Sequence, residues 1–69
     1  MSGYLVVIEK TEKNYSAFCP DLPGCVATGK TRRQAEKNIK EAIQFHLEGL
    51  KEEGQALPAH NSTAGYVLV

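Results

Sequence analysis

Four carboxylate residues of this sequence could hold metal ions if the fold brought them together. Glu9 follows an apolar run, Asp21 lies in a proline-rich loop, and Glu36 and Glu41 lie in a stretch with helical spacing. Hydrolysis by two metal ions needs several carboxylates converging on ions about 4 Å apart. The spacing of these four does not assemble such a cluster, so the sequence predicts that the chain is not an enzyme. A vestigial nuclease that depends on Glu9 or Asp21 stays as a third alternative.

Two cysteines and two histidines offer a second set of possible metal ligands. Cys19 and Cys25 flank the proline-rich loop, and His46 and His60 lie in the second half of the chain. Zinc sites carry their ligands at short spacings such as C-x2-C or H-x3-H, which are missing here. The sequence therefore predicts no metal, no cofactor and two reduced thiols.

Five basic residues gather around the start of the predicted helix, whereas its end carries Glu48, Glu52 and Glu53. This order opposes the helix dipole, which favours acidic side chains at the start of a helix. A solvated helix face is the simplest explanation, and contact with nucleic-acid phosphates is the alternative, although no base-reading module accompanies it. The residues of this alternative are Lys30, Arg32, Arg33, Lys37 and Lys40.

The balance of charge and the short length set further limits on function. Eight basic and eight acidic residues give a net charge of zero, which argues against a general nucleic-acid or membrane-surface binder. No apolar run approaches the ~20 residues of a membrane span, and no signal-peptide pattern is present, so we predict a cytoplasmic protein without membrane contact. A domain of 69 residues buries only about 60% of its surface, so we expect a homo-oligomer, with a dimer favoured.

Short apolar runs separated by turn residues predict the strands. Residues 4–8, 15–19 and 25–28 are three such runs, and residues 20–24 connect the second run to the third. Two prolines without N–H groups and one glycine make that connection rigid. A fourth apolar run, at residues 66–69, predicts a final strand.

The clearest local signal is a helix start at Thr31. The run from Thr31 to Gln34 matches the capping box, in which the threonine hydroxyl accepts the backbone N–H of Gln34 and the Gln34 side chain reaches back. Apolar residues then recur at three- and four-residue steps as far as Leu50, and Gly54 suits the position after the helix end. The sequence predicts one amphipathic helix whose apolar stripe faces the sheet.

These elements predict an α+β two-layer fold with the element order βββαβ. A right-handed crossover would place the fourth strand beside the first and parallel to it, giving a sheet of order 3-2-1-4 with the helix packed on one face. The opposite face and the edge strands would stay uncovered. A short terminal strand with unpaired backbone groups can add to the sheet of a dimer partner or of another protein.

The segment from Tyr15 to Thr31, together with the helix after it, closely resembles the HicB-like antitoxin family. Its diagnostic piece is a strand running into Pro-Asp-Leu-Pro-Gly-Cys, then a short strand, a glycine and a threonine-capped helix. The resemblance covers nearly the whole chain from Tyr4 through the helix. It implies a partial ribonuclease-H-like domain, and we expect residues 1–69 to form one such domain with no C-terminal DNA-binding segment.

The resemblance implies a protein that binds a small HicA-type toxin, an mRNA endonuclease with a catalytic histidine, and masks it by occlusion. We expect the rigid loop and the edge of the last strand to meet this toxin, because rigidity lowers the ordering cost of association. The expected partner-binding residues are Asp21, Leu22, Pro23, Gly24, Tyr66, Val67 and Leu68. A cytoplasmic antitoxin is therefore the first hypothesis, and direct nucleic-acid contact through the basic helix start is the second.

Overall fold

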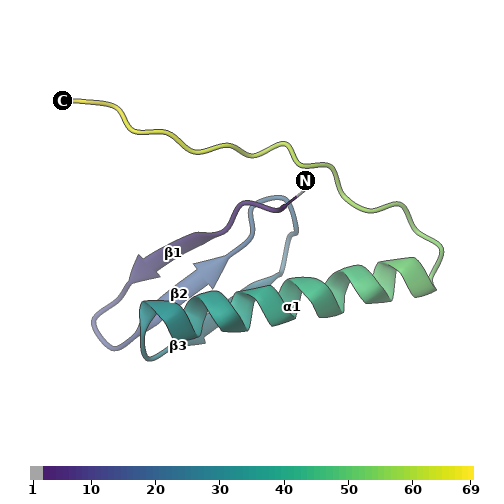
Figure 1. Cartoon of the computed structure of the whole chain (residues 1–69), viewed down its shortest axis with the longest axis horizontal. Coiled ribbons are helices and arrows are strands. Elements are labelled where there is room, and N and C mark those ends of the chain that lie inside the picture. Colours follow the sequence, from purple (N-terminus) through teal and green to yellow (C-terminus); the bar gives the residue numbers. More distant parts are fainter. Residues whose placement is uncertain (1–2) are drawn as a thin grey trace.

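The computed structural model describes residues 3–69. Three short strands, β1 (Val7–Lys10), β2 (Tyr15–Phe18) and β3 (Val26–Gly29), precede one long helix, α1 (Arg32–Glu52). The helix lies across one face of the sheet, and the chain after it runs back past the amino terminus as an extended segment (Figure 1). The predicted α+β fold, three strands followed by one packed helix, is confirmed.

The sheet is an antiparallel meander with the order β1-β2-β3. Val7 pairs with Phe18 on β2, and Phe18 pairs in turn with Val26 on β3. The turn between β1 and β2 closes where the Thr11 N–H donates to the Asn14 carbonyl over 2.8 Å and Thr11 Oγ1 accepts the Asn14 N–H over 3.0 Å. These local polar contacts fix the register in which β1 and β2 meet.

The helix begins where the capping signal predicts. Thr31 is the N-cap, and its hydroxyl accepts the backbone N–H of Gln34 over 3.0 Å. The Gln34 side chain does not reach back to Thr31, because it donates to the Asn38 side chain over 3.1 Å. The Asn38 amide in turn donates to the carbonyl of Thr28 over 2.7 Å. The hydrogen bond from Asn38 to Thr28 ties the first turns of α1 to β3.

The predicted fourth strand, at residues 66–69, is not part of the sheet that the described residues form. The sheet has three strands instead of four in the order 3-2-1-4, and residues 55–69 have no regular structure. The chain leaves α1 through Gly54, whose φ of 72° is readily adopted by glycine, and is next held between Pro58 and Ser62, at the end of the sheet. Beyond Ser62 the last residues do not lie against β1, so no ladder forms.

A small core joins the helix to the sheet. Ala35 and Ile39 of α1 cluster with Ala17 of β2, and Leu22 joins them from the loop after β2. Both cysteines belong to this core as free thiols, as predicted. The fully enclosed residues are Ala17, Cys19, Leu22, Cys25, Ala35 and Ile39. With so few enclosed side chains, each contact between α1 and the sheet carries much of the stability.

Helix α1 comes very close to β3 at Gly29. A methyl group added at this glycine would lie 2.4 Å from the backbone nitrogen of Ala35, well inside contact distance. The obstructing atoms belong to the helix backbone, so they cannot move aside as the end of a flexible side chain could. Packing therefore requires a glycine at position 29.

We expect Gly29→Ala to lower the free energy of unfolding by about 1–3 kcal/mol, because the added methyl must push α1 away from β3. Gly49→Ala is the matched control, since a methyl at that exposed helical glycine meets nothing within 4 Å. This control should raise the free energy of unfolding by about 0.5–1 kcal/mol. Urea unfolding followed by circular dichroism measures both, and equal stability of the two variants would contradict the close approach.

Candidate functional site

The loop between β2 and β3 is a rigid turn built on the side chain of Leu22. The Leu22 N–H donates to the Cys19 carbonyl over 3.1 Å, and the Cys25 N–H donates to the Leu22 carbonyl over 3.0 Å. Leu22 is fully buried, so it pins the loop to the core. Gly24 takes a φ of 84°, and Pro23 and Gly24 form the exposed tip of the loop.

Asp21 anchors the carboxyl-terminal tail, which we define as residues 55–69. Its carboxylate accepts the Ser62 N–H over 3.1 Å and the Ser62 hydroxyl over 2.9 Å. The hydrogen bond from the Ser62 backbone lowers the pKa of Asp21 below its usual 3.8, and the nearby His60 adds to this shift, whereas desolvation opposes it. The ionised carboxylate is therefore the form that holds the tail.

A second set of contacts clamps the tail just before Ser62. The rings of Tyr4 and His60 stack with their centroids 3.9 Å apart, and His60 Nδ1 lies 2.8 Å from the carbonyl oxygen of Gly3. The Tyr4 hydroxyl donates to the carbonyl of Pro58. Together with the Asp21 anchor, these contacts fix residues 58–62 across the end of the sheet from which β1 starts.

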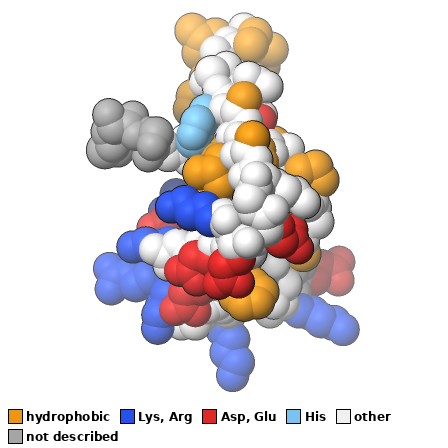
Figure 2. Space-filling view, turned by 90° about the vertical axis from the view of Figure 1, so that its right-hand side faces the viewer, with side chains coloured by type: hydrophobic (Ala, Val, Ile, Leu, Met, Phe, Trp, Pro, Cys, Tyr) orange, Lys and Arg blue, Asp and Glu red, His pale blue; other side chains and the backbone are white. Residues whose placement is uncertain are grey.

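Beyond its anchor the tail carries a fully exposed apolar end. Figure 1 shows the last residues running away from the domain, and Figure 2 shows hydrophobic side chains gathered at the top, where the tail ends. The relative exposures are 103% for Tyr66, 85% for Val67, 98% for Leu68 and 122% for Val69. Four consecutive apolar residues without cover are typical of a segment that binds another surface.

The structure links the loop half of the predicted partner site to the tail through Ser62, and not through residues 66–68 themselves. Asp21 contacts the tail through Ser62, the loop tip at Pro23 and Gly24 is exposed, and the apolar end 66–69 lies beyond the anchor. Sequence analysis did not find Ser62, nor the stacked pair that clamps the tail. The residues Asp21 and Ser62 are 41 positions apart, and no periodic pattern relates such distant residues.

The five basic residues of the alternative nucleic-acid site are all exposed around the start of α1. They are Lys30, Arg32, Arg33, Lys37 and Lys40. Figure 2 shows the Lys and Arg side chains projecting from the lower part of the molecule in several directions. A phosphate-binding site needs basic side chains that converge on one place. The exposure of these five side chains is consistent with a solvated helix face.

The described residues offer neither a metal site nor a helix for a membrane. No group of three or more His, Cys, Asp or Glu side chains within residues 3–69 could hold a metal ion. Burial raises the pKa of the Cys25 thiol, and the neighbouring Cys19 raises it further, so the unreactive thiol form is favoured. In the same part of the chain, no helix combines the length and the apolar character that crossing a membrane requires.

Comparison with known proteins identifies the family. The family described as HicB_like antitoxin of bacterial toxin-antitoxin system matches residues 4–68. The chain belongs to this family. The resemblance carried by the Pro-Asp-Leu-Pro-Gly-Cys segment is thereby confirmed, and the match extends through the tail that the sheet leaves unpaired.

Two of the relatives that this chain matches come from a phage and an archaeon. An uncharacterised 14.9 kDa protein of Haemophilus phage HP1 (strain HP1c1) is 42% identical over 64 residues, which cover 93% of this chain and 48% of that protein. A UPF0150 protein of Thermoplasma acidophilum is 43% identical over 60 residues, which cover 86% of this chain and 87% of that protein. The chain therefore spans about half of the phage relative and most of the archaeal one.

A solved structure shares the fold. A chain of the HicA3 and HicB3 toxin-antitoxin complex superposes with a TM-score of 0.67 and 38% sequence identity. The match covers 81% of the chain and 65% of that structure's chain. The HicB-like fold of this chain thus occurs in a protein of a toxin–antitoxin complex.

We expect the Asp21 anchor to be lost in acid. Because folding lowers the pKa of Asp21, the anchor stabilises the tail above the ordinary pKa of 3.8 and is lost as the pH falls through the lower folded value. The NMR resonance of the Ser62 amide should titrate with a midpoint below 3.8. In an Asp21→Asn control this titration should disappear. A wild-type midpoint at or above 3.8 would contradict the anchor.

Proposed function

We propose that this chain is an antitoxin that docks a small HicA-type mRNA endonuclease and masks its RNA-binding site. The observation that carries the proposal is the fold and 38% sequence identity shared with a chain of the HicA3 and HicB3 complex. Family membership over residues 4–68 supports it. The proposed site of action is the cytoplasm, where the target of an mRNA endonuclease is found.

The proposed toxin surface consists of the loop tip and the apolar end of the tail. Pro23 and Gly24 stand exposed on a loop that Leu22 pins to the core, so little conformational entropy is lost when a partner covers the tip. Tyr66, Val67 and Leu68 offer aromatic and branched side chains together with unpaired backbone groups, which suit addition to a sheet edge. Asp21 contributes indirectly, because it holds the tail beside the loop.

In this proposal the antitoxin does no chemistry. Masking requires only that the bound chain cover the toxin's RNA site, so the affinity depends on apolar burial and backbone hydrogen bonds. The zero net charge of the chain is consistent with such binding, since little of the attraction would come from long-range charge.

When the tagged protein is used as bait in a native lysate, it should capture a small basic protein that has an RNA-binding fold and carries a histidine. The capture should persist when the salt is raised from about 0.1 M to about 0.5 M, because a contact made by apolar burial is weakly screened. Mass spectrometry identifies what is retained. Recovery of nucleic acid alone, lost at the higher salt, would reject the antitoxin proposal and favour the basic helix start.

Pro23→Asp should weaken binding of the captured toxin by about tenfold or more, because it places an unpaired charge in the centre of the proposed contact. Arg33→Asp is a matched control, since Arg33 is also exposed and lies in the alternative basic site. Its effect on toxin binding should stay within about twofold. Calorimetric titration of the purified pair measures both. The reverse order of effects would place the contact on the basic surface.

A further inference from the structure

The outer side of β1 is an open sheet edge. In the order β1-β2-β3, only β2 has a neighbour on both sides. Hydrogen-bonded pairs alternate along an antiparallel ladder, and counting from the Thr11–Asn14 bond leaves Ile8 and Lys10 with backbone groups directed away from β2. This edge can therefore receive the backbone of one further strand.

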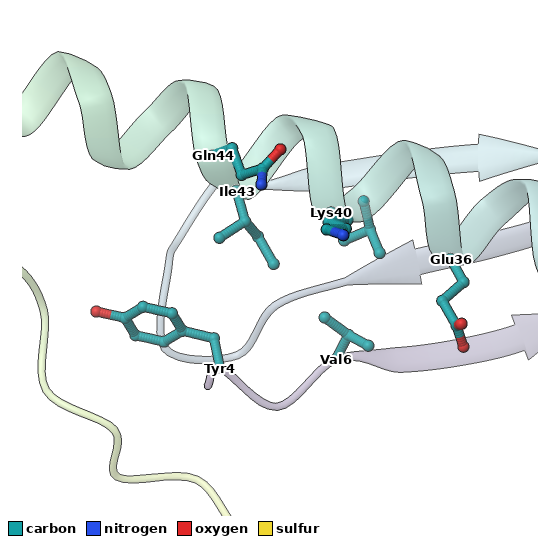
Figure 3. A pocket seen from close by; sticks show the side chains of 7 residues that line it. Tyr4, Val6, Glu36, Lys40, Ile43 and Gln44 are labelled. Carbon is teal, nitrogen blue, oxygen red and sulfur yellow. The ribbon is translucent and has the colours of Figure 1, made fainter. Parts of the chain in front are cut away.

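An apolar groove lies at the start of the same edge, between α1 and the residues Tyr4 and Val6 that lead into β1. Figure 3 shows Val6 and Ile43 facing each other across it, with the ring of Tyr4 at one end. The groove has a volume of 220 Å³, and Ile39 forms its floor. Its polar rim consists of Glu36, Lys40 and Gln44. A strand that pairs with β1 and with the residues just before it would direct every second side chain toward this groove.

The tail of the same chain does not fill the groove. The clamps at His60 and Ser62 hold it at the end of the sheet, and from there it diverges from its own β1 (Figure 1). The residues 66–69 consequently stay exposed. These residues suit the groove as an added strand, because they form an uncharged run of strand-forming residues. The opposite charges of Glu36 and Lys40 at the rim of the groove balance each other, so an uncharged segment meets no net charge there.

The surface area of the single chain indicates how much remains to be covered. The accessible surface is 5717 Å², whereas a compact monomer of 7.6 kDa exposes about 4,300 Å². The radius of gyration is 13.3 Å, against about 11 Å for a compact chain of this length. The excess of about 1,400 Å² exceeds the ~800 Å² that each partner buries in a standard interface.

We infer that a second copy of this chain occupies the groove: Tyr66–Val69 of each copy adds to β1 of the other as a fourth strand, in a reciprocal exchange. Each copy then offers one free strand and, beside the groove, the free edge of β1, so a two-fold pair satisfies both and closes on itself. The zero net charge means that two copies do not repel each other. The tail of each copy also becomes the outermost strand of the other copy's sheet.

The exchange adds to the proposed function and rests on it where it assigns the free edge of the exchanged tail to the toxin. The toxin surface includes the edge of the last strand, and pairing with β1 of a second copy would hold that strand extended and leave its outer edge free. The oligomeric state is measured on the chain alone, so it is tested without the toxin. A monomer that captures the toxin rejects the exchange only, and a dimer that captures none rejects the antitoxin proposal only.

Sedimentation velocity should show the wild-type chain as a dimer at tens of micromolar. Leu68→Asp should raise the dimer dissociation constant at least about 100-fold, since it puts a charge in the groove, and it spares the fold because Leu68 is 98% exposed. Thr63→Asp, in the same exposed tail but outside the strand, should remain dimeric. A monomeric wild type, or a dimer that Leu68→Asp leaves intact, overturns the exchange.

A variant in the groove, which receives the tail of the second copy, completes the test. Ile43→Lys places an ammonium group in the groove while its aliphatic stem keeps contact with the core, so the variant should fold and be monomeric. Phe45→Lys, at an 80% exposed position outside the groove, should stay dimeric. Mixing Ile43→Lys with Leu68→Asp should restore a dimer, because the intact tail of the first fits the intact groove of the second. Failure of this mixture to associate, with both variants folded by circular dichroism, overturns the exchange.

Discussion

The close contact between α1 and β3 at Gly29 and Ala35 is the constraint on which the rest of the structure depends. Because a glycine lets the two backbones approach, the helix packs most closely on β3 and least on β1. Ile39 is thereby enclosed with Ala17 of the central strand. Because α1 lies closer to β3 than to β1, its side toward β1 is left uncovered, and the apolar groove lies there. One tight backbone contact therefore sets both the core and the open edge.

The loop after β2 links stability to the partner surface through adjacent residues. Leu22 is enclosed in the core, while Asp21 beside it holds Ser62 of the tail. The backbone hydrogen bonds of the loop close on Cys19 and Cys25, which are themselves buried, so the residue that anchors the tail lies in a loop held by the core. A change that loosens the loop would consequently release the tail as well. This coupling explains how a domain with a thin core can present a positioned binding segment.

The surfaces of this HicB-like chain suit binding better than reaction. The apolar end of the tail carries no charge, and the groove beside β1 is apolar with a mixed polar rim. Burial favours the protonated form of the Cys25 thiol, and the basic side chains around the helix start are exposed to solvent. In the proposed complex the reactive groups belong to the toxin, and the work of this chain is to cover them. In the proposed dimer, one edge of the segment 66–69 would pair with β1 of the second copy. The opposite edge of the same segment would remain free for the toxin.

The sequence by itself determined the elements whose signals are local. The Thr31 cap, the turn at Thr11 and the proline-bounded loop each depend on hydrogen bonds or fixed dihedral angles within a few residues, and that loop also marks the family. The tertiary structure decided that the predicted last strand stays outside the sheet and that Ser62 anchors the tail, because the Asp21–Ser62 contact bridges 41 positions. An apolar β-forming run such as 66–69 has the same pattern whether it is paired or free. Its partner is determined by which edge lies within reach in three dimensions, and no local pattern contains that distance.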